Sequence, residues 1–147
     1  MINHYIICSC FAWITTQLFK FFSTLIIKKK VDFTRLVGAG GMPSSHAAFT
    51  CSLTALLLCV EGMASSAFAV AFVFSCIVIY DATGVRRETG RQAKLLNIMV
   101  EEWTQHGSTA NFGKRLKELI GHTKLEVTVG VIYGVIVGVA YYLLFLR

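Results

Sequence analysis

Two apolar runs stand back to back in MPSSHAAFTCSLTALLLCVEGMASSAFAVAFVFSCIVIYD, residues 42–81. Only Glu61 and Gly62 separate the first run, residues 42–60, from the second, residues 63–80. Each run approaches the length of about 20 mostly apolar residues that an α-helix needs to cross the hydrocarbon core of a bilayer. Because the break between them is so short, we expect the two helices to form a tight antiparallel hairpin in a membrane.

Two further apolar runs lie on either side of this pair, at residues 5–27 and 125–146. Gln17 and Lys20 interrupt the first of them, and Glu126 lies near the start of the last. The sequence therefore predicts an all-α fold, an integral membrane helical bundle with about four transmembrane helices.

Composition supports this class of protein. Hydrophobic residues make up 55% of the chain and charged residues 15%, where a soluble domain would carry about 25%. The net charge of +6 favours anionic lipid or a phosphorylated substrate over nucleic acid as a partner of so apolar a chain. All five cysteines lie in apolar runs, which indicates neither a disulfide framework nor a metal site. We expect one membrane domain over residues 1–147, whose first run is a retained helix rather than a signal peptide.

The connection over residues 81–124 is polar and basic. Apolar side chains recur with helical spacing in its sequence RQAKLLNIMVEEWTQH, at Leu95, Leu96, Met99 and Trp103. KRLKELIGH, residues 114–122, also predicts a short helix. We therefore expect one or two short helices within residues 86–120, packed on the bundle or on the membrane surface.

Four helices that alternate in direction would bring the charged segments to one face of the membrane and both termini to the other. The positive-inside rule makes the charged face cytoplasmic. In the last run, a glycine occupies every fourth position at Gly130, Gly134 and Gly138. Such a stripe lets another helix approach closely, either within the bundle or in a second copy of the chain, so a homodimer is one of two interpretations.

GAGGMPSSH, residues 38–46, combines three glycines with the chain's only proline, two serines and a histidine. If Pro43 opens the helix that follows, the amides of Ser44, Ser45 and His46 lie in its first turn without intrahelical acceptors. These amides, together with the positive end of the helix dipole, would stabilise a bound anion. The alternative is a flexible loop that only leads into a membrane helix.

His122 and Glu126 stand four residues apart at the start of the last apolar run, on one face of a helix. A carboxylate that accepts a hydrogen bond from one imidazole nitrogen fixes the tautomer and raises the basicity of the other nitrogen. The pair would thereby prepare a base or nucleophile. The alternative is a structural i,i+4 pair, although titratable groups at the edge of an apolar span are costly and favour a function.

These segments resemble a known superfamily. PSSH (43–46) resembles the PSGH motif of the type 2 phosphatidic acid phosphatases and vanadium haloperoxidases, and GHTKLEVTVG (121–130) is similar to their last motif. Lys28 and Arg35 have the spacing of the first motif, K-x6-R-P. Together with YDATGVRRETGRQA and LKELIGHT, they resemble the divergent bacterial and plant branch of the superfamily, over residues 28–138.

The resemblance implies a phosphatase that acts on a lipid or isoprenoid phosphate or diphosphate. His122 would be the nucleophile that forms a phosphohistidine, Glu126 its orienting carboxylate, and His46 the general acid. Lys28, Arg35 and Ser45 would hold phosphate oxygens. The free helix-start amide expected at Ser44 adds this residue to the phosphate-binding set. No metal or other cofactor is expected, because lysine and arginine supply the positive charge. We expect a multi-pass protein of a bacterial cytoplasmic membrane.

The chain departs from the superfamily's motifs at four positions, Leu36, Ser45, Leu116 and Glu126, where the motifs have Pro, Gly, Arg and Asp. Arg86 or Arg87, which follow Asp81, could supply the clamp that position 116 lacks, or could anchor the chain at the membrane surface. Two functions stay open: a phosphatase, and a catalytically inactive protein that binds lipid phosphate as a scaffold, sensor or transport component.

Overall fold

The computed structural model describes residues 3–28, 41–105, 115–116 and 122–147. The helices in these ranges are α1 (His4–Lys28), α2 (Ser45–Glu61), α3 (Ser66–Thr83), α4 (Val85–Gln105) and α5 (Lys124–Phe145). No β-strand occurs in the part of the chain that the structure describes. The all-α prediction is therefore confirmed, and α1, α2, α3 and α5 coincide with the four apolar runs.

The outer surface of the bundle is that of a membrane protein. α1, α5 and the continuous helix formed by α3 and α4 are long and apolar enough to cross a membrane. α2 is apolar but has only 17 residues, roughly 26 Å at the usual rise per residue. Large apolar side chains face outward from all sides of the bundle, among them Phe11, Val70, Phe74 and Ile136. Lipid solvates such a surface, whereas water does not.

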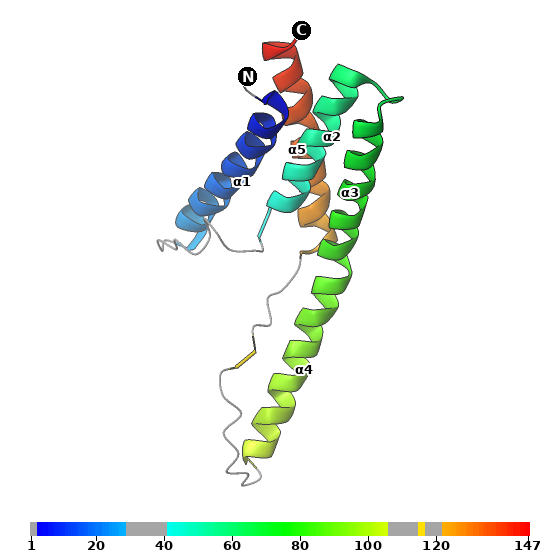
Figure 1. Cartoon of the computed structure of the whole chain (residues 1–147). Helices are drawn as coiled ribbons and strands as arrows, with labels where there is room; N and C mark the ends of the chain where they lie inside the picture. Colours follow the sequence, from blue (N-terminus) through cyan, green and yellow to red (C-terminus); the bar gives the residue numbers. More distant parts are fainter. Residues whose placement is uncertain (1–2, 29–40, 106–114, 117–121) are drawn as a thin grey trace.

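α2 lies at the centre of the bundle and packs against α1, α3 and α5 (Figure 1). Its most extensive contact is with α5, and the two helices run in the same direction because both begin at the same end of the bundle. A turn at residues 62–65 joins α2 to α3, with Gly62 at a φ of 80°. The expected tight hairpin is thus confirmed, and the hydroxyl groups of Thr54 and Ser75 are hydrogen-bonded across it at 2.9 Å.

The glycine stripe of α5 sets the distance between α2 and α5. A Cβ atom built on Gly130, Gly134 or Gly138 would lie 2.5–2.6 Å from a carbonyl oxygen of α2. The three oxygens belong, in order, to Ser44, Ala48 and Ser52. Of the two interpretations of the stripe, packing within the bundle is therefore the one the structure bears out.

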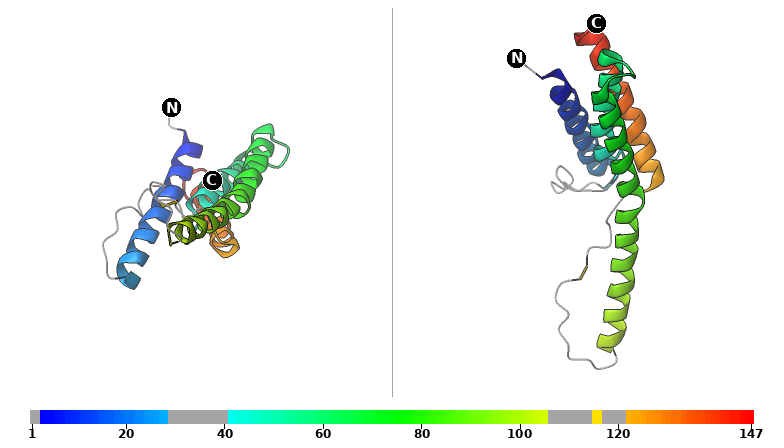
Figure 2. Two further views of the ribbon diagram at one scale, coloured as in Figure 1. Left: turned by 90° about the horizontal axis from the view of Figure 1, so that it is seen from below. Right: turned by 45° about the vertical axis from the view of Figure 1, so that its right-hand side comes forward.

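The described part of the connection contains one helix, as predicted, but this helix is longer than expected. α4 is a single helix of 21 residues, and only Gly84 separates it from α3. Figures 1 and 2 show α4 continuing beyond the bundle almost in line with α3. The sequence becomes polar at Asp81. Polar residues can end a membrane span without ending a helix, so the helical hydrogen bonding continues. Residues 115–116 are not helical, and 117–121 lie outside the described residues.

Candidate functional site

The end of α1, the start of α2, the end of α3 and the start of α5 meet at one end of the bundle, and both termini lie at the other (Figure 1). This is the arrangement that alternating spans predict. The candidate site residues that the structure describes therefore gather from elements far apart in the sequence.

His122 is fixed in place immediately before α5. Its backbone N–H donates to the carbonyl oxygen of Ala82 in the last turn of α3, at 3.1 Å. Thr123 caps α5 through a reciprocal pair of hydrogen bonds with Glu126, a capping box. These contacts bury the His122 side chain, which keeps only 4% of its surface exposed.

Glu126 orients the imidazole of His122 as predicted. Its Oε2 atom lies 3.1 Å from Nδ1 of His122 and also accepts the backbone N–H of Thr123 at 3.0 Å. An ionised carboxylate can only accept, so Nδ1 carries the proton and Nε2 keeps its lone pair. Nε2 is buried and has no hydrogen-bond partner among the described residues. The result is a bare, directed nitrogen, which is what a nucleophile or base requires.

The surroundings of His122 keep it neutral. Burial lowers the pKa of His122 below its ordinary value of 6.5, and the charges of Lys20 and Arg86 lower it further. The hydrogen bond and charge of Glu126 act in the opposite direction without cancelling the effect of burial. At neutral pH the Nε2 lone pair is therefore available.

His46 lies beside His122. It is in the first turn of α2, its side chain is exposed, and its ring centroid lies 6.2 Å from that of His122 in an edge-on arrangement. The backbone N–H of Ser44 donates to the carbonyl oxygen of Glu126 at 2.9 Å, which ties the starts of α2 and α5 together. The imidazole of His122 is thus buried, whereas that of His46 is exposed at this end of the bundle.

The predicted start of α2 at Pro43 was two residues too early, because the helix begins at Ser45. Ser44 is the N-cap, with extended backbone angles, and its Oγ accepts the N–H of Ala47, while Pro43 precedes the cap. The sequence predicted that the amide of Ser44 is free to bind an anion. This prediction was wrong, because the amide donates its hydrogen bond to α5. Ser45 and His46 do lie in the first turn, where amides lack intrahelical acceptors.

Lys20 is a site residue that the sequence reasoning passed over. Its Nζ lies 3.1 Å from Oγ of Ser45, and each of the two residues is only 2% exposed. α1 thus delivers a buried cation to the start of α2. The signal was present, because an ionisable residue within an apolar span is expensive unless it faces a functional interior.

The two arginines after α3 differ in their placement. Arg86 forms an ion pair with Asp81 and is half exposed, and its effect on the pKa of His122 places its charge near the site. Arg87 is exposed, and its side chain has no hydrogen bond or ion pair with another described residue. The structure therefore brings the charge of Arg86 toward His122, whereas Arg87 lies on the exposed surface.

Two predicted phosphate ligands lie outside the described residues: Arg35, and the side chain of Lys28, the last residue of α1. Leu116, at the position of the missing arginine, has its backbone N–H and C=O bound to the side-chain amide of Asn97, each at 2.9 Å. Within the described ranges no three His, Cys, Asp or Glu residues are grouped to hold a metal ion.

Comparison with known proteins places this arrangement in a family. No solved structure matches the chain. The chain is similar to an uncharacterized membrane protein, YuiD, of Bacillus subtilis (strain 168), with 35% identity over 143 residues that cover 91% of this chain and 90% of the relative. The model of the divergent PAP2 family matches residues 1–137. The chain therefore belongs to the divergent PAP2 family.

Proposed function

We propose that this protein hydrolyses the phosphate or diphosphate group of a lipid or isoprenoid at a membrane face, through a phosphohistidine on His122. The observation that carries the proposal is the bare Nε2 atom of His122, whose partner nitrogen faces Glu126 while the ring of His46 lies 6.2 Å away. A buried nitrogen without a partner is costly in a structural role and useful in a chemical one.

The reaction proceeds in two steps that restore both histidines. Nε2 of His122 attacks phosphorus in line, and the N–P bond forms as the P–O bond to the leaving group breaks. His46, protonated at the start, transfers its proton to the leaving oxygen. Water then attacks the phosphohistidine, His46 takes a proton from this water, and the N–P bond breaks to release phosphate.

Positive charge at the site stabilises the phosphoryl group during transfer. Lys20 and Ser45 supply a buried ammonium and a hydroxyl in direct contact, and Arg86 adds a charge from the end of α3. Lys28 and Arg35 complete this set in the proposal, in keeping with the first motif of the superfamily.

The direct test uses purified protein in detergent with phosphatidic acid and an isoprenyl diphosphate as substrates. Wild type is expected to release phosphate, and His122→Ala to lose this activity. His4→Ala is the matched control, because His4 binds Tyr141 at the opposite end of the bundle. Rapid acid-free quenching should trap a base-stable, acid-labile phosphoprotein in wild type only. Absence of phosphate release across both substrates would contradict the proposal.

A second function is favoured by the positions that depart from the superfamily motifs. The hydroxyl of Ser45, at the motif glycine, is held by Lys20, and Leu116 occupies the place of a phosphate-binding arginine. A protein with these changes could bind lipid phosphate without turnover, as a scaffold, sensor or transport component. Tight binding that persists in His122→Ala, with no phosphate release from wild type, would select this function.

The same reasoning extends to location and partners. Four apolar helices that alternate in direction fit a multi-pass protein, and the relative from a bacterium fits a bacterial cytoplasmic membrane. The partners in this proposal are the membrane and its phosphorylated lipids, not nucleic acid.

A further inference from the structure

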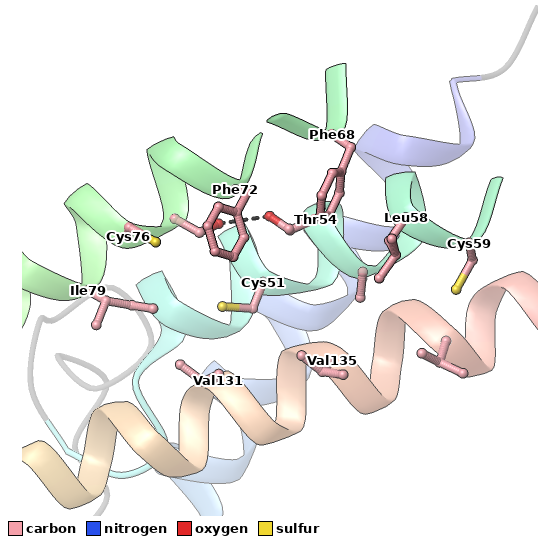
Figure 3. A pocket seen from close by; sticks show the side chains of 13 residues that line it. Cys51, Thr54, Leu58, Cys59, Phe68, Phe72, Cys76, Ile79, Val131 and Val135 are labelled. Atoms are coloured by element: carbon pink, nitrogen blue, oxygen red, sulfur yellow. Dashed lines mark hydrogen bonds between the residues drawn. The ribbon is translucent and has the colours of Figure 1, made fainter. Parts of the chain in front are cut away.

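An apolar groove runs along the bundle between α3 and α5, with α2 as its floor (Figure 3). Its volume is about 300 Å³. The residues that define it come from all three helices and include Cys51, Phe72, Cys76, Ile79, Val131 and Val135.

The hydroxyl groups of the groove already have hydrogen-bond partners, and its cysteines behave as small apolar residues. The hydroxyl of Thr54 is hydrogen-bonded to that of Ser75 and to the carbonyl oxygen of Thr50. The groove therefore offers a ligand only apolar contacts, and hydrocarbon is the chemistry that fits it.

One end of the groove lies beneath the candidate site. Ile79 and Val131 line the groove and also pack against the buried cluster of Ala47, Ala82 and Val127. Ala82 is the residue whose carbonyl oxygen holds the backbone of His122. A chain in the groove would thus end about one layer of side chains from the histidine.

The groove is elongated along the bundle. On α5 it extends from Val131 to Val139, which is about 12 Å along a helix. This elongated shape suits an extended hydrocarbon chain lying along the helices.

We propose that this groove binds one hydrocarbon chain of the same lipid whose phosphate reacts at His122. This rests on the function proposed above and names the part of the substrate that the bundle recognises. Linking chain and headgroup in one molecule makes the second contact intramolecular, so both sites gain affinity together.

A second groove provides an internal control. It lies between α1 and α5, has a volume of about 520 Å³ and is larger, but its lining includes Ile7, Tyr141 and Phe145, toward the end that carries the termini. Among the described residues, its lining has no hydrogen bond or ring contact with His46 or His122. Val135 and Ile136 are neighbours in sequence and both exposed, yet one lines each groove.

The kinetic test compares Val135→Trp with Ile136→Trp, on a long-chain alkyl phosphate and on a short water-soluble phosphate ester. Val135→Trp fills the groove and should lower kcat/KM for the long-chain substrate by roughly tenfold or more, with the short ester unaffected. Ile136→Trp should leave both unchanged. Equal rates for wild type and Val135→Trp on the long-chain substrate would overturn the proposal.

A photolabelling test does not depend on turnover. A long-chain alkyl phosphate with a diazirine in its chain should label Phe72 and Cys76 of α3 more strongly than the same molecule with a neutral alcohol headgroup. Equal labelling by both probes, or preferential labelling of Ile7 and Phe11 in the other groove, would rule out the assignment. Groove labelling by the phosphate probe without phosphate release from wild type would reject the hydrolytic function and retain the groove.

Discussion

The two nitrogens of His122 have opposite roles. Nδ1 donates to a carboxylate that also caps α5, whereas Nε2 is buried with no partner in the described part of the chain. Leaving one buried polar atom unpaired costs about 1–3 kcal/mol. The arrangement is therefore unfavourable for stability alone, and it is the residue-level reason to expect chemistry at this end of the bundle.

The pH dependence of activity tests this role. Burial holds the pKa of His122 below 6.5, and protonation below that pKa removes the nucleophile, so kcat/KM should rise with pH through an acidic limb centred below 6.5. At higher pH, kcat/KM should fall again as His46 loses the proton that it transfers to the leaving group. Glu126 raises the pKa of His122, so Glu126→Gln should move the acidic limb to lower pH and reduce the maximal kcat/KM by roughly 10²-fold. Titration of the substrate is common to both proteins, so the difference between the two pH profiles isolates His122. An unshifted limb would argue against the pairing.

The buried ammonium of Lys20 should act on the phosphate. Lys20→Met keeps the length of the side chain and suits an apolar span, so we expect the bundle to fold and kcat/KM to fall by roughly 10²-fold. Lys124→Met, which removes an exposed lysine from the first turn of α5, is the matched control and should keep wild-type activity. If both variants retain full activity, Lys20 has only a structural role beside Ser45.

At the level of single residues, the sequence predicted the pairing of His122 with Glu126 better than it predicted the positions of the charged groups around them. The spacing of His122 and Glu126 predicted their hydrogen bond, because both positions are local to one helix start. The pairing of Lys20 with Ser45 depends on how α1 packs against α2, which no local pattern specifies. For that reason, Lys20 was noted only as an interruption of an apolar run.

The pairing of α2 with α5 is the element-level basis of the site. The glycines of α5 face small residues of α2, and the two backbones come so close that a methyl group has no room. The sequence showed the stripe but not its partner, since small residues at every fourth position suit any neighbouring helix. α2 supplies that partner with Ser44, Ala48 and Ser52 at the same spacing.

Gly134→Ala tests this contact, because the sign of its effect on the free energy of unfolding is informative. In an exposed helix, Ala would be more favourable than Gly by about 1 kcal/mol. Here the added Cβ meets the carbonyl oxygen of Ala48 at 2.6 Å, so we expect a net loss of about 1–3 kcal/mol from overpacking. Thermal unfolding in detergent measures the change, with lipid-facing Ile132→Ala as the control. A gain in stability for Gly134→Ala would show that the helices separate freely.

Helix ends were harder to predict than helix positions. The apolar run stops at Tyr80, but α3 continues to Thr83 and α4 resumes at Val85. Hydropathy reports the surroundings of a side chain, whereas helix termination depends on backbone hydrogen bonding and caps. At the start of α2, Pro43 was expected in the first helical position, but the side chain of Ser44 caps the helix and α2 begins at Ser45.

The candidate site and the two chain termini lie at opposite ends of the molecule. His46 and His122 lie at the end of the bundle where α2 and α5 begin, and both termini lie at the other (Figure 1). α4 projects from the site end, so the basic residues of its first turns lie beyond the apolar part of the bundle (Figure 2). A membrane around the apolar part would place the site and the termini in different compartments.

This arrangement predicts a definite sidedness. Epitope tags at the N- and C-termini should be reached by antibody from the same side of sealed vesicles, and a membrane-impermeant short phosphate ester should be hydrolysed only from the opposite side. Vesicles of inverted orientation serve as the control and should exchange the two results. Tags on opposite sides would mean an odd number of crossings and would contradict the four-helix arrangement.

The parallel direction of α2 and α5 has an electrostatic consequence for the stability of the protein. Each helix start carries the equivalent of about half a positive elementary charge, and the Ser44–Glu126 hydrogen bond holds the two starts together, so like poles face one another beside a buried ammonium. A bound phosphate or vanadate ion would relieve that repulsion, which makes occupancy and folding a single linked equilibrium. Orthovanadate should therefore raise the unfolding temperature of the wild type, and less so that of Lys20→Met. In a cell, scarcity of the ligand would then appear as loss of the protein itself, through the quality control that removes unfolded membrane chains.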